Sequence, residues 1–176
     1  MSAEKYFLEV KGFCPICHQD TAFHAYGPWL RGTFYCQTCE KGSVPRERAL
    51  ALVLSEVAPN WRYLKIHESS PAPRGISIAL KRDCPQYIGS HYYPDKPFGS
   101  LVDGWRNEDL RKQTFEDGGF DLVISLDVME HVFHPDEVFK EIHRTLKPGG
   151  MYVSTFPIHK HQVGAAINRA VLDEDG

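Results

Sequence analysis

Residues 120–126 constrain the fold of this chain more than any other part of the sequence. They read Phe-Asp-Leu-Val-Ile-Ser-Leu, a nearly continuous apolar run of strand length, which is typical of a strand buried on both faces of a parallel sheet. A helix is expected from Pro135, because apolar residues then recur with helical spacing until the breakers of residues 147–150. Another strand is expected over 151–156, so this part of the chain predicts a strand–helix–strand unit.

An alternation of helices and strands is also predicted in the residues before that unit. Residues 43–58 have Pro45 in the first turn and apolar residues at helical spacing, which predicts an amphipathic helix. Strands are expected at 63–66, 87–89 and 101–102, with a short helix over 76–80. This order predicts an α/β fold, a doubly wound and mostly parallel sheet, in which ligands bind beyond the carboxyl ends of the strands.

Two C-x-x-C elements near the amino terminus predict a metal site. Cys14 and Cys17 form the first and Cys36 and Cys39 the second, with a spacing typical of a four-cysteine zinc ribbon. Four thiolates complete a closed tetrahedron around Zn²⁺, so the metal is expected to be structural and the folding of the ribbon metal-dependent. The alternative is a redox dithiol, but a thioredoxin-like centre uses a single C-x-x-C at a helix start. Cys84 is left over.

Size, charge and composition limit the classes of function. With 176 residues and 42% hydrophobic content, one compact core plus a small appendage is expected. We divide the chain into a zinc ribbon at 1–42, a linking helix at 43–59 and an α/β domain at 60–176. The formal net charge of −3 leaves a nucleic-acid partner unsupported. No apolar stretch is long enough for a membrane span and the leader pattern is absent, so a cytoplasmic location is expected; the sequence does not determine an oligomeric state.

The text FDLVISLDVMEHVFHPDEVFKEIHRTLKPGGMYVSTFP, residues 120–157, resembles class I S-adenosylmethionine-dependent methyltransferases of the type 11 kind. The apolar strand, the D-V-x-E-H-V loop, the helix and the LKPGG turn are specific in combination. Residues 106–115 resemble the preceding family element, in which an Asp-Leu pair lies beside the adenine of the cofactor. The resemblance implies a Rossmann-like domain that transfers a methyl group from S-adenosylmethionine to an unidentified acceptor, such as a small metabolite or a glycan-type hydroxyl.

The resemblance also implies which residues bind the cofactor. The candidates lie at strand ends and in the loops that follow them: Glu68, Ser69, Ser70, His91, Asp109, Leu110, Leu126 and Asp127. The family's glycine-rich first loop is absent, and its positions are taken by Lys65, His67, Ser69 and Pro71. Alternatives remain for several of the candidates. Glu68 is equally interpretable as a solvated loop carboxylate, His91 as a loop histidine, and Leu126 as a core residue.

His131 is the candidate catalytic residue. In relatives that methylate oxygen, a histidine in this neighbourhood accepts the proton of the substrate, and the ordinary pKa of histidine suits that role. The alternative interpretation places Glu130 and His131 in a network that fixes the start of a helix.

Two further expectations concern the whole chain. A non-catalytic scaffold that binds partners through its zinc ribbon is the alternative function, and a shared basic face of Arg31, Lys41, Arg46 and Arg48 would favour nucleic acid. Residues 158–176 contain no buried-strand pattern, whereas the resembling fold has about two more strands. Either a truncated sheet or a reduced domain with an exposed strand edge is therefore expected.

Overall fold

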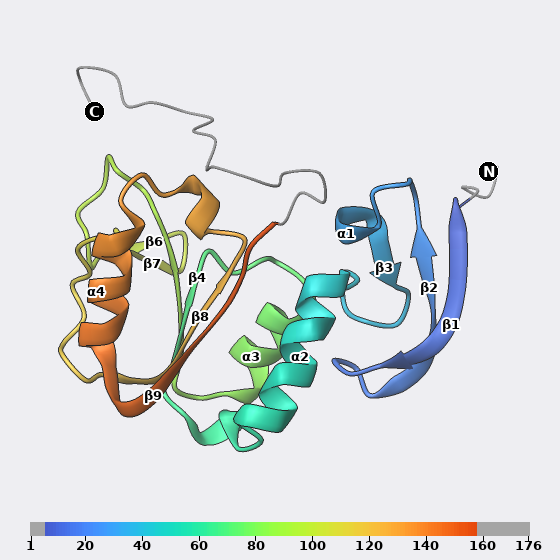
Figure 1. Cartoon of the computed structure of the whole chain (residues 1–176), viewed down its shortest axis with the longest axis horizontal. Helices are drawn as coiled ribbons and strands as arrows, with labels where there is room; N and C mark the ends of the chain where they lie inside the picture. Colours follow the sequence, from blue (N-terminus) through green and yellow to red (C-terminus); the bar gives the residue numbers. More distant parts are fainter. Residues whose placement is uncertain (1–5, 158–176) are drawn as a thin grey trace, which may run out of the picture.

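The computed structural model describes residues 6–157, which form two sheets (Figure 1). The smaller sheet is antiparallel, with β1 (Leu8–Cys14), β2 (Gln19–Ala25) and β3 (Phe34–Cys36) in that order. The short helix α1 (Leu30–Thr33) lies between β2 and β3. This antiparallel sheet carries both C-x-x-C elements, and we call it the ribbon.

The larger sheet has the strand order β6-β7-β5-β4-β8-β9. Its strands are β4 (Ile66–Ser69), β5 (Tyr87–His91), β6 (Leu101–Val102), β7 (Trp105–Asn107), β8 (Phe120–Leu126) and β9 (Leu146–Thr155). All neighbouring pairs are parallel except β6 with β7. The expected doubly wound, mostly parallel sheet is therefore confirmed.

Helices cover both faces of this sheet (Figure 1). They are α2 (Pro45–Val57), α3 (Gly75–Asp83) and α4 (Pro135–Thr145), with short 3-10 turns η1 (Trp61–Tyr63) and η2 (Met129–His131). Leu122 and Ile124 of β8 pack in the core under α2 and α3, whereas Val123 packs in the core under α4. Alternate side chains of β8 thus enter two different cores, which explains why nearly every residue of this strand is apolar.

The structure corrects three element boundaries. Residues 61–63 form the turn η1, so the first strand of the large sheet begins at Ile66 and runs to Ser69. Residues 101–102 form an antiparallel edge strand, and the third parallel strand is β7, which the sequence analysis did not predict. β9 begins at Leu146 because residues 146–150 continue along β8 through an irregularity near Phe120, after α4 has ended.

Arg48 joins the ribbon to α2. Its guanidinium group lies 4.5 Å from the ring centre of Phe23 and 5.4 Å from that of Phe34. It also donates hydrogen bonds to the carbonyl oxygens of Phe34 (3.2 Å) and Ser43. Through Arg48 the ribbon therefore packs against α2, the helix that leads into the large sheet.

Two expectations concern membranes and the carboxyl terminus. In the part of the chain that the structure describes, no helix combines the length and apolar character that a bilayer span requires. The expectation for residues 158–176 lies outside the described residues.

Candidate functional site

The four cysteines of the ribbon lie around a single point. Their sulfur atoms are all within 4.8 Å of one another, with 3.6 Å between Cys14 and Cys39 and 4.0 Å between Cys17 and Cys36. A tetrahedral zinc ion with Zn–S bonds of about 2.3 Å places its sulfur atoms about 3.8 Å apart, so the donor set fits zinc. Three of the thiols are buried and Cys17 is half-buried.

Backbone bonds hold the two metal-binding turns in shape. The amide of His18 donates to the carbonyl of Cys14 (2.9 Å), and the amide of Gly42 donates to that of Cys39 (2.8 Å). The amide of Cys39 lies 3.4 Å from the sulfur of Cys36 and donates to it. Such N–H donors stabilise thiolates, which is the form that binds metal. Cys84 lies apart from the cluster and donates to the carbonyl of Leu64.

A cleft of 430 Å³ lies at the carboxyl ends of β4, β5 and β8. Seven of the residues predicted from the sequence line it: Ser69, Ser70, His91, Asp109, Leu110, Asp127 and His131. They come from four separate segments of the chain, and the strand order places these segments at one edge of the sheet. This is the position at which doubly wound sheets bind ligands.

Ser69 and Ser70 form the floor of the cleft where β4 ends. Ser69 is buried and its hydroxyl is 3.4 Å from the carbonyl oxygen of Ile124, to which it donates. Ser70 has φ +52°, a left-handed conformation that usually favours glycine, and its amide donates to the carbonyl of Ser90 (2.7 Å). The chain therefore makes a tight turn here without the glycines of the family loop.

Glu68 and Leu126 stand outside the cleft in which they were expected. The buried carboxyl of Glu68 accepts hydrogen bonds from the hydroxyls of Ser77 and Tyr87, both at 2.7 Å. Burial raises the pKa of Glu68 to about 7. Leu126 packs against the core beneath α2 and α3. Successive strand residues point to opposite faces, so neighbours of cleft residues along a strand need not enter the cleft.

Asp109 is held by Arg111. Its carboxylate accepts hydrogen bonds from the Arg111 Nη2 (2.9 Å), Nε (3.2 Å) and backbone amide (2.9 Å). Burial opposes ionisation, but these bonds outweigh it and leave the pKa of Asp109 below its ordinary value. The preceding residue, Glu108, is buried and accepts hydrogen bonds from Arg106 (2.6 Å) and Thr114 (2.7 Å).

Three histidines lie at or below the cleft. His91 packs edge-on against Trp105 at 5.2 Å between ring centres, and burial lowers its pKa. His131 is exposed on η2. His67 lies beneath the cleft, with its Nε2 2.8 Å from the hydroxyl of Ser90. Burial lowers the pKa of His67 to about 3, so its ring is neutral.

Asp127 connects the cleft to the ribbon. Its carboxylate accepts a hydrogen bond from Arg31, lies 3.4 Å from Nε of Arg46, and accepts a bond from the Thr155 hydroxyl (2.8 Å). Arg31, Arg46 and Arg48 are thus engaged within the chain.

Sequence reasoning missed half of the cleft lining. The missed residues are Ser90, Tyr92, Glu108, Arg111, Val128, Val132 and Phe133. Most of them are next to a predicted residue in the sequence. Extending each prediction by one or two positions in both directions along the sequence would have found them.

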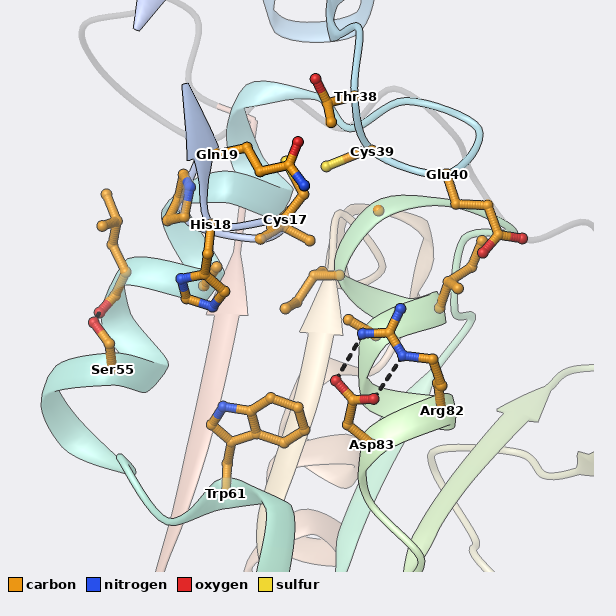
Figure 2. A pocket seen from close by; sticks show the side chains of 18 of the residues that line it. Cys17, His18, Gln19, Thr38, Cys39, Glu40, Ser55, Trp61, Arg82 and Asp83 are labelled. Atoms are coloured by element: carbon orange, nitrogen blue, oxygen red, sulfur yellow. Dashed lines mark hydrogen bonds and ion pairs between the residues drawn. The ribbon is translucent and has the colours of Figure 1, made fainter. Parts of the chain in front are cut away.

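A second cavity, of 620 Å³, lies between the ribbon and the helices α2 and α3. Figure 2 shows Cys17 and His18 of the ribbon on one side of it and Trp61 and Asp83 on the other. None of the cofactor candidates lines this cavity. Its walls are the metal-binding turns of the ribbon and the sides of α2 and α3, and not the carboxyl ends of parallel strands, so the smaller cleft is the candidate site.

Comparisons with known proteins found similarity to one family and to several solved structures. Residues 90–154 match the family described as a methyltransferase domain. Among solved structures, the PH0226 protein of Pyrococcus horikoshii OT3 is 24% identical with a TM-score of 0.51, over 62% of this chain and 55% of that one. No curated protein sequence gives a significant match.

Two other solved structures resemble the chain less closely. An S-adenosylmethionine-dependent methyltransferase of Mesorhizobium loti is 19% identical with a TM-score of 0.44, over 60% of this chain and 52% of that one. The trans-methyltransferase CalH, in complex with S-adenosylhomocysteine, is 23% identical with a TM-score of 0.40, over 53% of this chain and 32% of that one. The chain spans 55% or less of the length of these three proteins. The chain therefore combines the sheet order of a doubly wound α/β fold, a segment over residues 90–154 that matches a methyltransferase-domain family, and a four-cysteine cluster in the ribbon.

Proposed function

We propose that this chain belongs to an enzyme that transfers a methyl group from S-adenosylmethionine, with the cofactor in the cleft at the carboxyl ends of β4, β5 and β8. The observation that carries the proposal is the convergence of seven predicted residues on one cleft. Its volume of 430 Å³ falls within the range of about 300–1,000 Å³ that is typical of small-molecule sites.

The lining residues fit the parts of such a cofactor. Leu110, Val132 and Phe133 supply apolar surface for a purine base, while Ser70 and His91 supply a hydroxyl and an imidazole for polar groups. When bound, S-adenosylmethionine supplies a methyl group made electrophilic by the adjacent sulfonium. The protein then has to place an acceptor atom in line with that methyl and to exclude water.

We further propose His131 as the group that takes the proton from the acceptor. It lines the cleft and is exposed, whereas its neighbour Glu130 does not line the cleft. An acceptor hydroxyl, on a small metabolite or a glycan, loses its proton as its oxygen bonds to the methyl carbon and the carbon–sulfur bond breaks. An imidazole that lines the cleft is suited to receive that proton.

The metal site and the location of the protein are parts of the same proposal. The four cysteines would hold one structural Zn²⁺, because the thiol donor set and the spacing of the sulfur atoms suit a closed tetrahedron. Thiols kept for metal binding suit a reducing compartment, so the cytoplasm is the proposed location.

Calorimetric titration with S-adenosylhomocysteine tests the cofactor site. The zinc-loaded chain is expected to bind with a Kd on the order of micromolar. Leu110→Arg, which places a charge in the cleft, should weaken binding by about tenfold or more. Leu52→Arg is the matched control, because Leu52 lines the second cavity and is 55% exposed.

The outcomes separate the alternatives. Loss of binding in Leu52→Arg but not in Leu110→Arg would move the cofactor to the second cavity. No binding by the folded, zinc-loaded chain would favour the non-catalytic scaffold.

His131 needs a separate measurement. In a methyl-transfer assay over a panel of hydroxyl acceptors, His131→Gln should lower kcat by about 10²-fold or more if the histidine is a general base. The Kd of the His131→Gln variant for S-adenosylhomocysteine should equal that of the wild type. An unchanged kcat would assign His131 to the helix-start network.

A further inference from the structure

We propose that Arg31 of the ribbon is a positioning residue for the cofactor cleft of the large sheet, and that it acts by holding Asp127 and the loop that follows. This inference rests on the proposed function for the identity of the cleft's ligand. It gives the ribbon a role beyond its own stability, because the metal cluster then supports the geometry of the cleft.

The contact is made between residues far apart in the sequence. Arg31 and Asp127 are separated by 96 positions, and the Nη2 of Arg31 donates to Oδ1 of Asp127. Arg46, in the first turn of α2, approaches the other carboxylate oxygen. Figure 1 shows α1, which carries Arg31, on the side of the ribbon toward the end of β9.

This ion pair differs from an ordinary surface pair. The side chain of Asp127 is 19% exposed and that of Arg31 is 33% exposed, and two arginines share the one carboxylate. Isolated exposed pairs contribute little because water and salt screen them. Partial burial and the shared carboxylate make this contact stronger and more directional.

Asp127 has a backbone conformation that requires such support. Its φ is +55°, in the left-handed region that is unfavourable for residues other than glycine. The backbone amide donates to the carbonyl of Thr155 (3.1 Å), and the Thr155 hydroxyl donates to Oδ1 (2.8 Å). β9 therefore holds one side of the residue, and the two arginines hold the other.

The loop after Asp127 forms one wall of the cleft. Val128, His131, Val132 and Phe133 all line it. The loop has two apolar contacts with the core, through buried Met129 and half-buried Val132, and it leaves β8 through Asp127. Its position therefore depends on how Asp127 directs the chain out of β8.

The position of Arg31 depends in turn on the ribbon. Helix α1 has four residues and none of them is buried. It is held by the strands at its ends, through the bond from the amide of Tyr26 to the carbonyl of Thr33 (3.1 Å), and β3 then leads directly to Cys36. Metal binding at Cys36 would therefore order β3, the strand that follows α1, and so hold Arg31 against Asp127.

The test compares Arg31→Ala with the wild type, both zinc-loaded. Arg31→Ala should weaken S-adenosylhomocysteine binding by about tenfold, a size typical of coupling between sites. Without any ligand, the backbone amides of residues 128–133 should exchange hydrogen faster than in the wild type, while zinc content stays the same. Arg31→Lys, which keeps the charge, should restore part of the affinity.

Arg82→Ala is the matched control, because Arg82 is 63% exposed, pairs with the adjacent Asp83 and lines the second cavity. It should leave affinity and exchange unchanged. If Arg31→Ala does not fold, Arg31→Gln is measured in its place, with the same expected results.

Equal affinity and equal exchange in wild type and Arg31→Ala would overturn the inference and leave the proposed function intact. If the wild type itself binds no S-adenosylhomocysteine, the proposed function fails. Hydrogen exchange over 128–133 then decides whether the ribbon holds the loop.

Discussion

The carboxylate of Glu47 occupies the space that a side chain on residue 75 would need. Gly75 begins α3 with φ +54°, and a Cβ atom added there would lie 2.4 Å from Oε2 of Glu47 and 3.1 Å from Cβ of Ser43. The buried carboxylate of Glu47 accepts a hydrogen bond from the amide of Val44 (3.0 Å) and lies 2.9 Å from Nε of Arg74. The start of α2 and the start of α3 are therefore interlocked.

Substitution of Gly75 should be more destabilising than substitution of another glycine with positive φ. We expect Gly75→Ala to lower the free energy of unfolding by about 2–4 kcal/mol, from backbone strain and the clash with Glu47. Gly104 also has a positive φ, but an added Cβ meets nothing within 4 Å. Gly104→Ala should therefore cost only about 1–2 kcal/mol. Equal losses in urea unfolding would show that Glu47 yields without cost.

Metal content should depend on the ribbon cysteines and not on Cys84. Elemental analysis of protein purified without chelator should find about one zinc ion per chain. Cys36→Ser should lower that content sharply and melt the ribbon, because an incomplete donor set does not hold the metal tightly. Cys84→Ser is the control, since Cys84 is buried away from the cluster. Zinc retained by Cys36→Ser but lost by Cys84→Ser would contradict the assignment.

Arg48 should matter more for stability than Arg62, although both lie over aromatic rings. Arg62 stacks on Trp61 at 4.3 Å, but its side chain is 46% exposed. Arg48 contacts two rings and two carbonyl groups at the boundary between ribbon and α2. We expect Arg48→Ala to cost about 2–3 kcal/mol and Arg62→Ala less than about 1 kcal/mol. Thermal unfolding with matched zinc content measures the difference, and similar losses would mean that the boundary contacts contribute little.

His67 and Glu68 should have opposite effects on stability in acid. Burial holds the pKa of Glu68 near 7 against an ordinary 4.5. The contribution of Glu68 to the free energy of unfolding is therefore fully present below pH 4.5 and is lost as the pH rises through 7. Burial holds the pKa of His67 near 3 against an ordinary 6.5, so its contribution is present above pH 6.5 and is lost as the pH falls. Between pH 4.5 and 6.5 the two effects nearly cancel.

Glu68→Gln should reveal the effect of His67 alone. Glutamine keeps partners for Ser77 and Tyr87 without titrating. Relative to the wild type, the variant should lose about 1.4 kcal/mol of unfolding free energy for each pH unit from 6.5 down to 4.5. Urea unfolding at several pH values measures this slope, and parallel profiles for variant and wild type would contradict the raised pKa of Glu68.

Local patterns in the sequence predicted the parts of this protein that local chemistry determines. The apolar run at 120–126 predicted a strand buried on both faces, and β8 indeed enters two cores. The two C-x-x-C elements predicted a four-cysteine cluster, because each such turn presents two thiols about one point. The alternation of strands and helices predicted the sheet, and with it the edge at which candidate residues gather.

The tertiary structure decided what depends on contacts between distant segments. β7 has three residues and joins the sheet through its pairing with β5, so no local periodicity marks it. Glu68 and Ser69 are neighbours, yet the packing of α3 against the sheet gives one a buried network and the other a place in the cleft. The link from Arg31 to Asp127 depends on how the ribbon docks on α2, and that arrangement arises from packing rather than from any pattern in either segment.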